Sequence, residues 1–180
     1  LNDAQSILKI ALKHKPDLVD VAPDAALACG TVDLLKANGF RVFGPTKQAA
    51  RIEWDKKWSR EFMQCHGVPA PAFKYFDDER NARKHAEGIY AENPNALVFV
   101  KAAGLCAGKG ALKARSLNEA LSAIAQMKTF GDAGSVFLIE EGLVGEEFSY
   151  YAISDGKTFK VFKSAQDNKT VFDGDKGAQT

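Results

Sequence analysis

The first fifty residues alternate between helical and extended hydrophobic patterns. Apolar positions near the N-terminus recur at helical spacing until Pro16 interrupts them, and a later helical pattern ends at Asn38-Gly39, a typical C-terminal cap. Helix and strand alternating at this spacing predict part of a parallel α/β sheet. The expected elements are a helix over 4–15, a strand over 18–22, a helix over 27–37 and a strand over 41–43.

A helical stretch follows and ends at a proline-marked boundary. Thr46 is placed to cap a short helix over 48–53, and a longer helix is expected over 55–66, ending at Gly67. Pro69 and Pro71 then break the helical pattern. We expect the junction between two domains here.

The remainder alternates differently, with short strands around two amphipathic helices. Ser116 and Glu119 form a capping-box pattern at the start of the second helix, and Ser154-Asp-Gly-Lys157 is typical of a hairpin turn. Residues 165–180 are polar and without periodicity, which predicts a loop. The expected strands are 72–76, 97–101, 111–114, 137–140, 146–154 and 159–162, and the expected helices are 78–91 and 116–127.

Composition narrows the class of protein. The chain has 180 residues, 46% hydrophobic and 26% charged, with a formal net charge of +1, which gives no reason to expect nucleic acid or an anionic membrane as partner. No apolar run approaches the roughly 20 residues that a membrane helix needs. Cys29, Cys65 and Cys106 are too scattered for a disulfide framework or a zinc site, and they predict a reducing compartment, the cytoplasm.

The stretch from Val98 to Gly110 carries the strongest chemical signal. Its glycines, Gly104, Gly108 and Gly110, let backbone N–H groups approach a ligand, and Lys101 and Lys109 add positive charge. The loop fits neither the Walker A spacing nor the dinucleotide fingerprint, and strands are expected on both sides of it. It is therefore predicted to be a hairpin flap over phosphates; the alternative is a plain hairpin with solvated lysines.

An acidic motif, Ile139-Glu-Glu-Gly-Leu-Val-Gly-Glu-Glu147, supports a nucleotide over the plain hairpin. A buried acid at a strand end requires a partner. The amino group of adenine suits Glu140, the N–H of Leu143 suits a ring nitrogen of the base, and Glu147 suits ribose hydroxyls. The alternative is an acidic hairpin tip in water. Cys106 is expected to be a small buried hydrophobe, since no histidine lies near it to activate a nucleophile.

Taken together, these motifs resemble the ATP-grasp superfamily and, within it, the phosphoribosylamine–glycine ligase (glycinamide ribonucleotide synthetase) family. The resemblance covers essentially the whole chain and implies an α/β and α+β fold. The motifs that carry it are Phe43-Gly-Pro-Thr46, the flap from Lys101 to Gly110, the motif 139–147, and Gln166-Asp-Asn-Lys169 with Asp173-Gly-Asp175 and Gly177.

The resemblance implies a role for each motif. Lys56 and Lys101 would contact ATP phosphates beneath a mobile flap with Gly104, Gly108, Lys109 and Gly110. Adenine would be held by Glu140, Glu141 and Leu143, and ribose by Glu147. The loop with Asp167, Lys169, Asp173 and Asp175 would border the substrate sites. Asn168 stands where the family usually has His, and Cys106 where the flap commonly has Ala.

The resemblance also implies how the chain is divided. Residues 1–54 would be the end of an N-terminal parallel α/β domain, 55–71 a helical linker, 72–139 a complete α+β ATP lid and 140–180 the start of an antiparallel catalytic core. The family's first strand is expected to precede Leu1. Its acidic and amide ligands for Mg²⁺ (or Mn²⁺) are expected beyond Thr180, so no metal ligand is assigned here.

The implied activity is an ATP-dependent ligation in de novo purine biosynthesis. Glycine would be activated as glycyl phosphate and captured by 5-phosphoribosylamine, giving glycinamide ribonucleotide, ADP and phosphate. The expected partners are these small molecules, without nucleic acid or membrane, and no catalytic residue is singled out. The alternatives are another purine-pathway ATP-grasp ligase or carboxylase, or a non-catalytic nucleotide-binding fragment, because the 180 residues alone are expected to be inactive.

Overall fold

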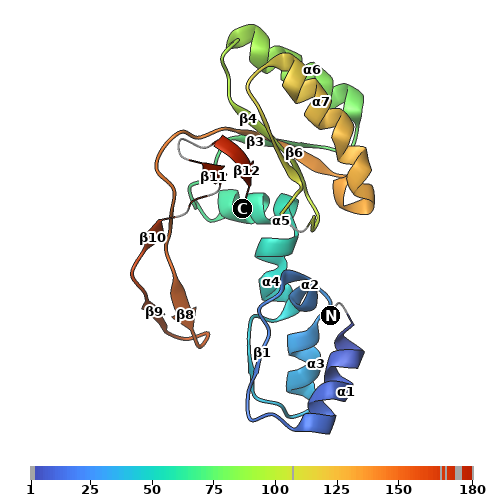
Figure 1. Ribbon diagram of the computed structural model, residues 1–180, viewed down its shortest axis with the longest axis vertical. Helices are drawn as coiled ribbons and strands as arrows, with labels where there is room; N and C mark the ends of the chain where they lie inside the picture. The colour runs from blue at the N-terminus through green and yellow to red at the C-terminus, as the bar shows by residue number, and fades with distance from the viewer. Residues whose placement is uncertain (1–2, 107, 167, 169, 173–175, 180) are drawn as a thin grey trace. The chain divides into compact units, whose positions relative to one another are not determined.

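The computed structural model describes residues 3–106, 108–166, 168, 170–172 and 176–179. It divides the chain into two compact units, residues 1–142 and residues 143–180 (Figure 1). The predicted substrate residues Asp167, Lys169, Asp173 and Asp175 lie outside the described residues. The domain limits expected from the sequence stay predictions.

The N-terminal segment contains the parallel strand pair that the sequence predicts. Val19 pairs with Val42 and Asp20 with Phe43 in parallel register. Leu35 and Val32 are fully buried in the apolar core that the surrounding helices form with the strands. The elements are α1 (Ala4–His14), β1 (Val19–Asp20), α2 (Asp24–Ala28), α3 (Thr31–Ala37), β2 (Val42–Phe43) and α4 (Lys47–Trp54).

The single helix expected over 27–37 is wrong, because two helices occupy this region. Gly30 has a φ of +82°, a left-handed conformation that interrupts the helical hydrogen-bond ladder between α2 and α3. The pattern of apolar positions continues across the break, because both helices place residues in the same core. Hydrophobic spacing alone therefore cannot detect the interruption.

Two caps define the helices before the proline-marked boundary. The Thr46 side chain accepts a hydrogen bond from the N–H of Ala49, which confirms the predicted start of α4. Asp55 ends α4 and caps α5 (Lys56–Cys65) by accepting from the N–H of Trp58. Asp55 thus separates two helices within the first unit.

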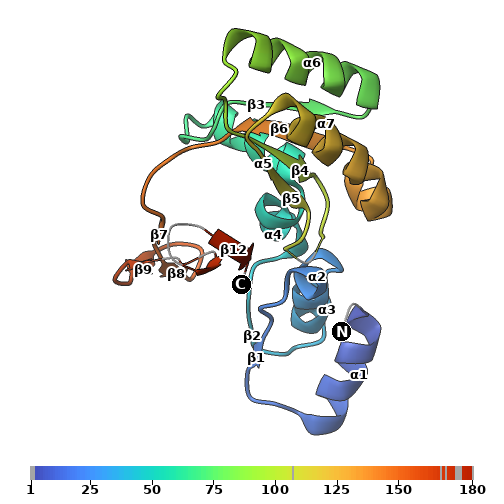
Figure 2. The ribbon, with the colours of Figure 1, turned by 45° about the horizontal axis from the view of Figure 1, so that its top comes forward.

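A four-stranded antiparallel sheet follows, in the order β3-β6-β4-β5. Helices α6 and α7 lie along one of its faces, and α7 leads into a short 3-10 segment, η1, that the sequence did not predict (Figures 1 and 2). The elements are β3 (Phe73–Phe76), α6 (Glu79–Glu92), β4 (Val98–Ala102), β5 (Ala111–Ala114), α7 (Leu117–Gln126), η1 (Met127–Gly134) and β6 (Phe137–Glu141).

The predicted capping box at the start of α7 is present in a modified form. The Ser116 hydroxyl accepts from the N–H of Glu119 at 3.3 Å. The Glu119 carboxylate accepts in return from the N–H of Arg115, at 2.7 Å, one residue before the capping position. Two N–H groups at the helix start are therefore satisfied, as in a standard capping box.

The strand register separates the sheet into an apolar face and a polar face. Val98, Val100 and Ile139 belong to the core beneath α6 and α7. Because successive side chains of a strand point to opposite faces, Lys101 and Glu140 belong to the other face. The candidate ATP residues of β4 and β6 are thus turned away from the core of this sheet.

The second unit consists of short antiparallel strand pairs. Asp155 and Gly156 form the predicted hairpin turn between β8 and β9. The continuous strand expected over 146–154 is wrong, because two short strands, β7 and β8, occupy it. The loop expected over 165–180 is also wrong, because its described residues form three strands, β10, β11 and β12. The strands of this unit are β7 (Phe148–Ser149), β8 (Ala152–Ser154), β9 (Phe159–Val161), β10 (Ala165–Gln166), β11 (Thr170–Phe172) and β12 (Lys176–Gln179).

Pairing explains why these strands escape the sequence pattern. β10 pairs with β7, and β11 with β12. Backbone hydrogen bonds to a partner can form a strand from polar residues that show no alternation of their own.

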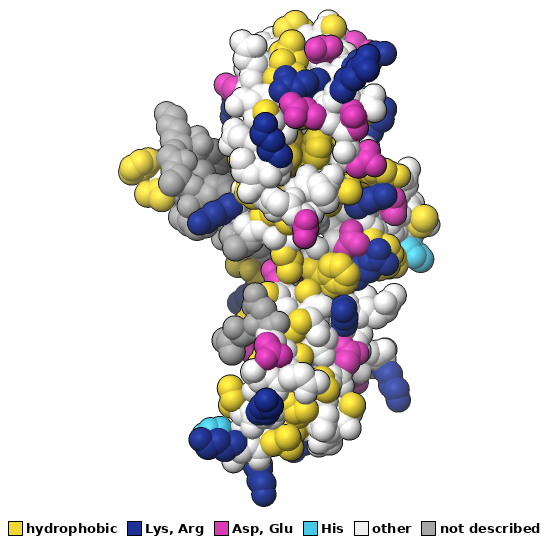
Figure 3. All heavy atoms as spheres, turned by 90° about the vertical axis from the view of Figure 1, so that its right-hand side faces the viewer, with side chains coloured by type: hydrophobic (Ala, Val, Ile, Leu, Met, Phe, Trp, Pro, Cys, Tyr) yellow, Lys and Arg dark blue, Asp and Glu magenta, His cyan; other side chains and the backbone are white. Residues whose placement is uncertain are grey.

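Two further observations concern the helices and the surface charge. Among the described residues, no helix is both long and apolar enough to cross a membrane. On the face drawn in Figure 3, basic and acidic side chains are interspersed.

Candidate nucleotide-binding site

The polar face of the sheet is organised around a buried carboxylate, Glu140. This residue lies on β6, an interior strand of the sheet, and its side chain is only 1% exposed. Arg60 of α5 donates from Nε to Glu140 Oε1 at 2.6 Å. Lys101 of β4 places Nζ 2.6 Å from Oε2 as an ion pair, without the alignment of a hydrogen bond. Glu140 therefore has a cationic partner on each oxygen.

These two cations determine the charge state of Glu140. Burial acts to raise the pKa of a carboxyl group because it disfavours the charged form. At Glu140 the hydrogen bond from Arg60 and the close positive charges of Arg60 and Lys101 outweigh this effect and hold the pKa below its ordinary value. The group is thus an anion between two cations, and the three residues together carry one surplus positive charge.

The glycine loop joins β4 to β5 as a hairpin, as the sequence predicts. Lys101 pairs with Ala111, and the N–H of Ala102 donates to the carbonyl of Gly110 at 2.8 Å. Within the loop, the N–H of Lys109 donates to the carbonyl oxygen of Cys106 at 3.0 Å, and Lys109 is exposed. The loop is closed at its base, and an exposed lysine lies beyond it.

Helix α5 begins directly against the base of this loop. The N–H of Lys56 donates to the carbonyl of Ala103 at 3.0 Å, which satisfies one of the unpaired donors at the helix start. The N–H groups of Ala103 and Gly104 donate to the backbone of the η1 region, to Val136 and Ala133. The structure thus brings Lys56 to the loop, although it lies 45 positions before Lys101 in the chain.

At each glycine of the loop, a different physical reason disfavours a side chain. A Cβ on Gly104 would lie 2.8 Å from the Cα of Ala133, and one on Gly110 would lie 2.7 Å from the Cβ of Cys106. Gly108 has open space around it but a φ of +78°. Close packing therefore accounts for two glycines and backbone conformation for the third, whether or not a phosphate binds. Cys106 packs against the sheet core, as expected for a small hydrophobe.

The end of β6 and the connector after it carry the remaining predicted adenine and ribose residues. The N–H of Glu141 donates to the carbonyl oxygen of Ala72 at 2.8 Å, and the N–H of Gly142 donates to that of Leu97 at 2.7 Å. Leu143, which is 65% exposed, and Glu147 belong to the second unit. The structure thus brings Lys56, Lys101, Glu140 and the glycine loop together within the first unit.

Arg60 is the residue of this site that the sequence did not reveal. The sequence indicated that Glu140 needs a partner, because a buried acid is seldom left unpaired. It did not indicate which residue, because an arginine 80 positions away has no distinguishing pattern. Arg60 also borders an open groove of about 890 Å³, which Gln64 and residues 67–75 line.

The described residues contain no cluster of three or more His, Cys, Asp or Glu side chains that could hold a metal ion. No metal position is therefore assigned to them.

Comparison with known families agrees with this geometry. Residues 1–53 match the N domain of phosphoribosylglycinamide synthetase, and residues 54–180 match its ATP-grasp (A) domain.

Individual relatives agree as well. The chain is 39% identical over 183 aligned positions to a phosphoribosylamine–glycine ligase of Streptococcus pyogenes, covering 100% of this chain and 42% of the relative. It is 38% identical to the ligase of that name from Chlorobaculum tepidum, again over 42% of the relative. The chain thus spans under half the length of these relatives.

A solved structure extends the agreement to the fold. The crystal structure of phosphoribosylamine–glycine ligase from Thermotoga maritima matches with a TM-score of 0.76 and 27% identity, covering 96% of this chain and 42% of that one. The expectation of an ATP-grasp fold with both parallel and antiparallel sheets is confirmed. The chain belongs to the phosphoribosylglycinamide synthetase family.

Proposed function

We propose that the chain forms the nucleotide-binding part of an ATP-dependent ligase that joins glycine to 5-phosphoribosylamine. The observation that carries the nucleotide assignment is the surplus positive charge of Arg60 and Lys101 around buried Glu140, on the sheet face beside a glycine hairpin. A polyanion such as a nucleotide phosphate is the complementary ligand. Family membership and the names of the curated relatives support the choice of substrates.

Each element of the site has a role in this proposal. Lys101 and Lys56 neutralise the phosphates of ATP, and the loop with Gly104, Gly108, Lys109 and Gly110 covers them. Glu141 and Leu143 hold the adenine, and Glu147 the ribose. Glu140, whose two oxygens face Arg60 and Lys101, sets the charge of the site. Asp167, Lys169, Asp173 and Asp175 border the sites for glycine and the ribosylamine. Magnesium or manganese, when bound, adds further charge neutralisation at the phosphates.

The proposed chemistry depends on positioning and charge rather than on a protein nucleophile. Glycine carboxylate accepts the γ-phosphoryl group of ATP, and the amine of phosphoribosylamine then displaces phosphate, which leaves glycinamide ribonucleotide, ADP and phosphate. The lysines stabilise the charge on the transferring phosphoryl group. The closed loop excludes water, which would hydrolyse the glycyl phosphate. Three free cysteines support a cytoplasmic setting.

The activity is tested in a chimera, because the chain spans 42% of its relatives. This chain replaces the matching segment of the Streptococcus pyogenes ligase, and ADP release is measured. We expect release that requires both glycine and phosphoribosylamine, and a loss of at least about a hundredfold in Lys101→Met. Arg83→Met, which removes a surface ion pair with Glu79, is the matched control and should retain activity.

The same assay separates the competing functions. Release that requires a different carboxylic acid would replace the glycine assignment with another ATP-grasp activity. A folded chimera that binds ADP but releases none with any acid would favour a non-catalytic nucleotide-binding role. A folded chimera that neither binds ADP nor turns over would contradict the nucleotide assignment itself.

A further inference from the structure

Arg60 and Lys56 lie on the same side of α5. They are four residues apart, which is about one helical turn, so their side chains leave the helix in similar directions. The N–H of Lys56 contacts the base of the glycine loop, and the Arg60 side chain reaches Glu140. One helix therefore connects the base of the loop with the buried carboxylate.

Two nitrogens of the Arg60 guanidinium have contacts within the protein. Nε donates to Glu140 Oε1 at 2.6 Å, and Nη1 lies 3.5 Å from the sulfur of Met63. The side chain is 19% exposed. Its contacts hold it on Glu140, whereas the ion pair of Lys101 with the other carboxylate oxygen lacks hydrogen-bond alignment.

The consequence concerns the charge that Lys101 can offer. With Arg60 on Oε1, Glu140 is already neutralised, and the charge of Lys101 is available to a phosphate. Without Arg60, Lys101 would be the only cation on a buried anion and would be held there, since an unpaired buried carboxylate is costly. The positive charge of the site would then be cancelled.

We propose that Arg60 is a positioning residue of the nucleotide site, which neutralises Glu140 so that Lys101 can bind phosphate. The inference rests on the proposed function and names the residue that tunes the site. It makes the phosphate part of the ligand, rather than the nucleoside part, sensitive to Arg60.

The test measures the affinities of the full chain for ADP and for adenosine by calorimetry. We expect Arg60→Met to weaken ADP binding about tenfold and to change adenosine binding by less than about twofold. Arg60→Lys, which keeps a cation, should restore most of the ADP affinity. Arg83→Met is the matched control and should bind both ligands normally. If Arg60→Met does not fold, Arg60→Gln removes the charge while keeping a donor and carries the same expectation.

A double-mutant cycle with Glu140→Gln tests whether Arg60 acts through Glu140. Without the carboxylate there is nothing to neutralise, so Arg60→Met should then weaken ADP binding by about twofold or less. A loss that stays near tenfold in this background would show direct phosphate binding and overturn the inference.

The remaining outcomes are equally decisive. Equal losses for ADP and adenosine would indicate a merely structural role, and unchanged ADP binding in Arg60→Met would overturn the inference while leaving the proposed function intact. No ADP binding by the unaltered, folded chain would overturn both.

Discussion

Lys101 and Glu140 are diagonal neighbours on adjacent antiparallel strands. Lys101 pairs with Leu138 and Glu140 pairs with Phe99, so the two charged residues lie two positions apart in register, on the same face of the sheet. Their charged groups approach to 2.6 Å. The β4–β6 register therefore sets this ion pair. A slip of one residue would place Lys101 and Glu140 on opposite faces of the sheet.

The first prediction concerns acid sensitivity. The pKa of Glu140 is held below its ordinary value in the folded protein, so the unfolded chain binds the proton more readily. The stability that this group contributes is then complete above the unfolded glutamate pKa, about 4.3, and is lost as pH falls through the folded pKa. We expect the free energy of unfolding, measured by urea denaturation, to decrease when the pH is lowered beneath about 5.

Glu140→Gln is the variant that assigns this acid effect. It leaves Arg60 and Lys101 without their anion and should lower the free energy of unfolding by about 2–4 kcal/mol at pH 7. The difference from the unaltered protein should shrink as the pH falls from 5 towards 3. A difference that stays constant over this range would show that Glu140 does not titrate as described.

The second prediction contrasts two glycines. Gly104→Ala should lower the free energy of unfolding by about 1–3 kcal/mol, because the new Cβ would lie 2.8 Å from backbone of Ala133. Gly88→Ala is the matched control, because Gly88 is exposed within α6 and has no atom within 4 Å of the added Cβ. It should raise stability by about 0.5–1 kcal/mol in thermal unfolding. Equal effects at the two sites would contradict the packing of the loop base against η1.

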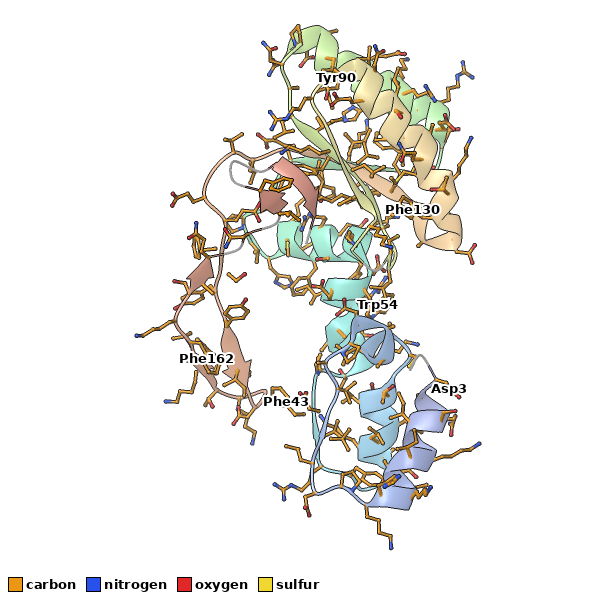
Figure 4. The ribbon with its side chains drawn as sticks, viewed as in Figure 1. Asp3, Phe43, Trp54, Tyr90, Phe130 and Phe162 are labelled. Atoms are coloured by element: carbon orange, nitrogen blue, oxygen red, sulfur yellow. The ribbon has the colours of Figure 1, made fainter. Side chains whose placement is uncertain are left out.

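The third prediction concerns Tyr90, which lies on α6 and is labelled in Figure 4. Its buried hydroxyl donates to the carbonyl of Ala114 on β5 at 3.1 Å. Tyr90→Phe should lower the free energy of unfolding by about 1 kcal/mol, since the packing is kept and one buried hydrogen bond is lost. Chemical denaturation measures this loss. No change on substitution would argue against the hydrogen bond.

The fourth prediction concerns the break between α2 and α3. Gly30→Ala should lower the free energy of unfolding by about 1–2 kcal/mol, because alanine is strained at a φ of +82° although space for its Cβ is available. Gly30→Asn should cost less, since asparagine tolerates the left-handed region better. Thermal unfolding of both variants tests this order. A stabilising alanine would mean that the chain prefers one continuous helix here.

Local patterns in the sequence determined most elements of the first unit. Hydrophobic spacing located the helices, and the capping residues Thr46 and Ser116 located the starts of two of them, because a cap acts within one turn of its own helix. The glycine loop was identified as a hairpin from the strands on either side of it. The break at Gly30 was missed, because helical spacing persists on both sides of a single left-handed residue.

What only the tertiary structure decided is the set of partners that meet across long sequence separations. The sequence indicated that Glu140 needed a donor, but Arg60 reaches it from a helix 80 positions earlier, and the strand register brings Lys101 to it. The strands after residue 165 likewise depend on backbone pairing with partners that no local pattern specifies. Capping and hydrophobic spacing act over a few residues, whereas charge pairing and strand pairing act between any segments that the fold brings together.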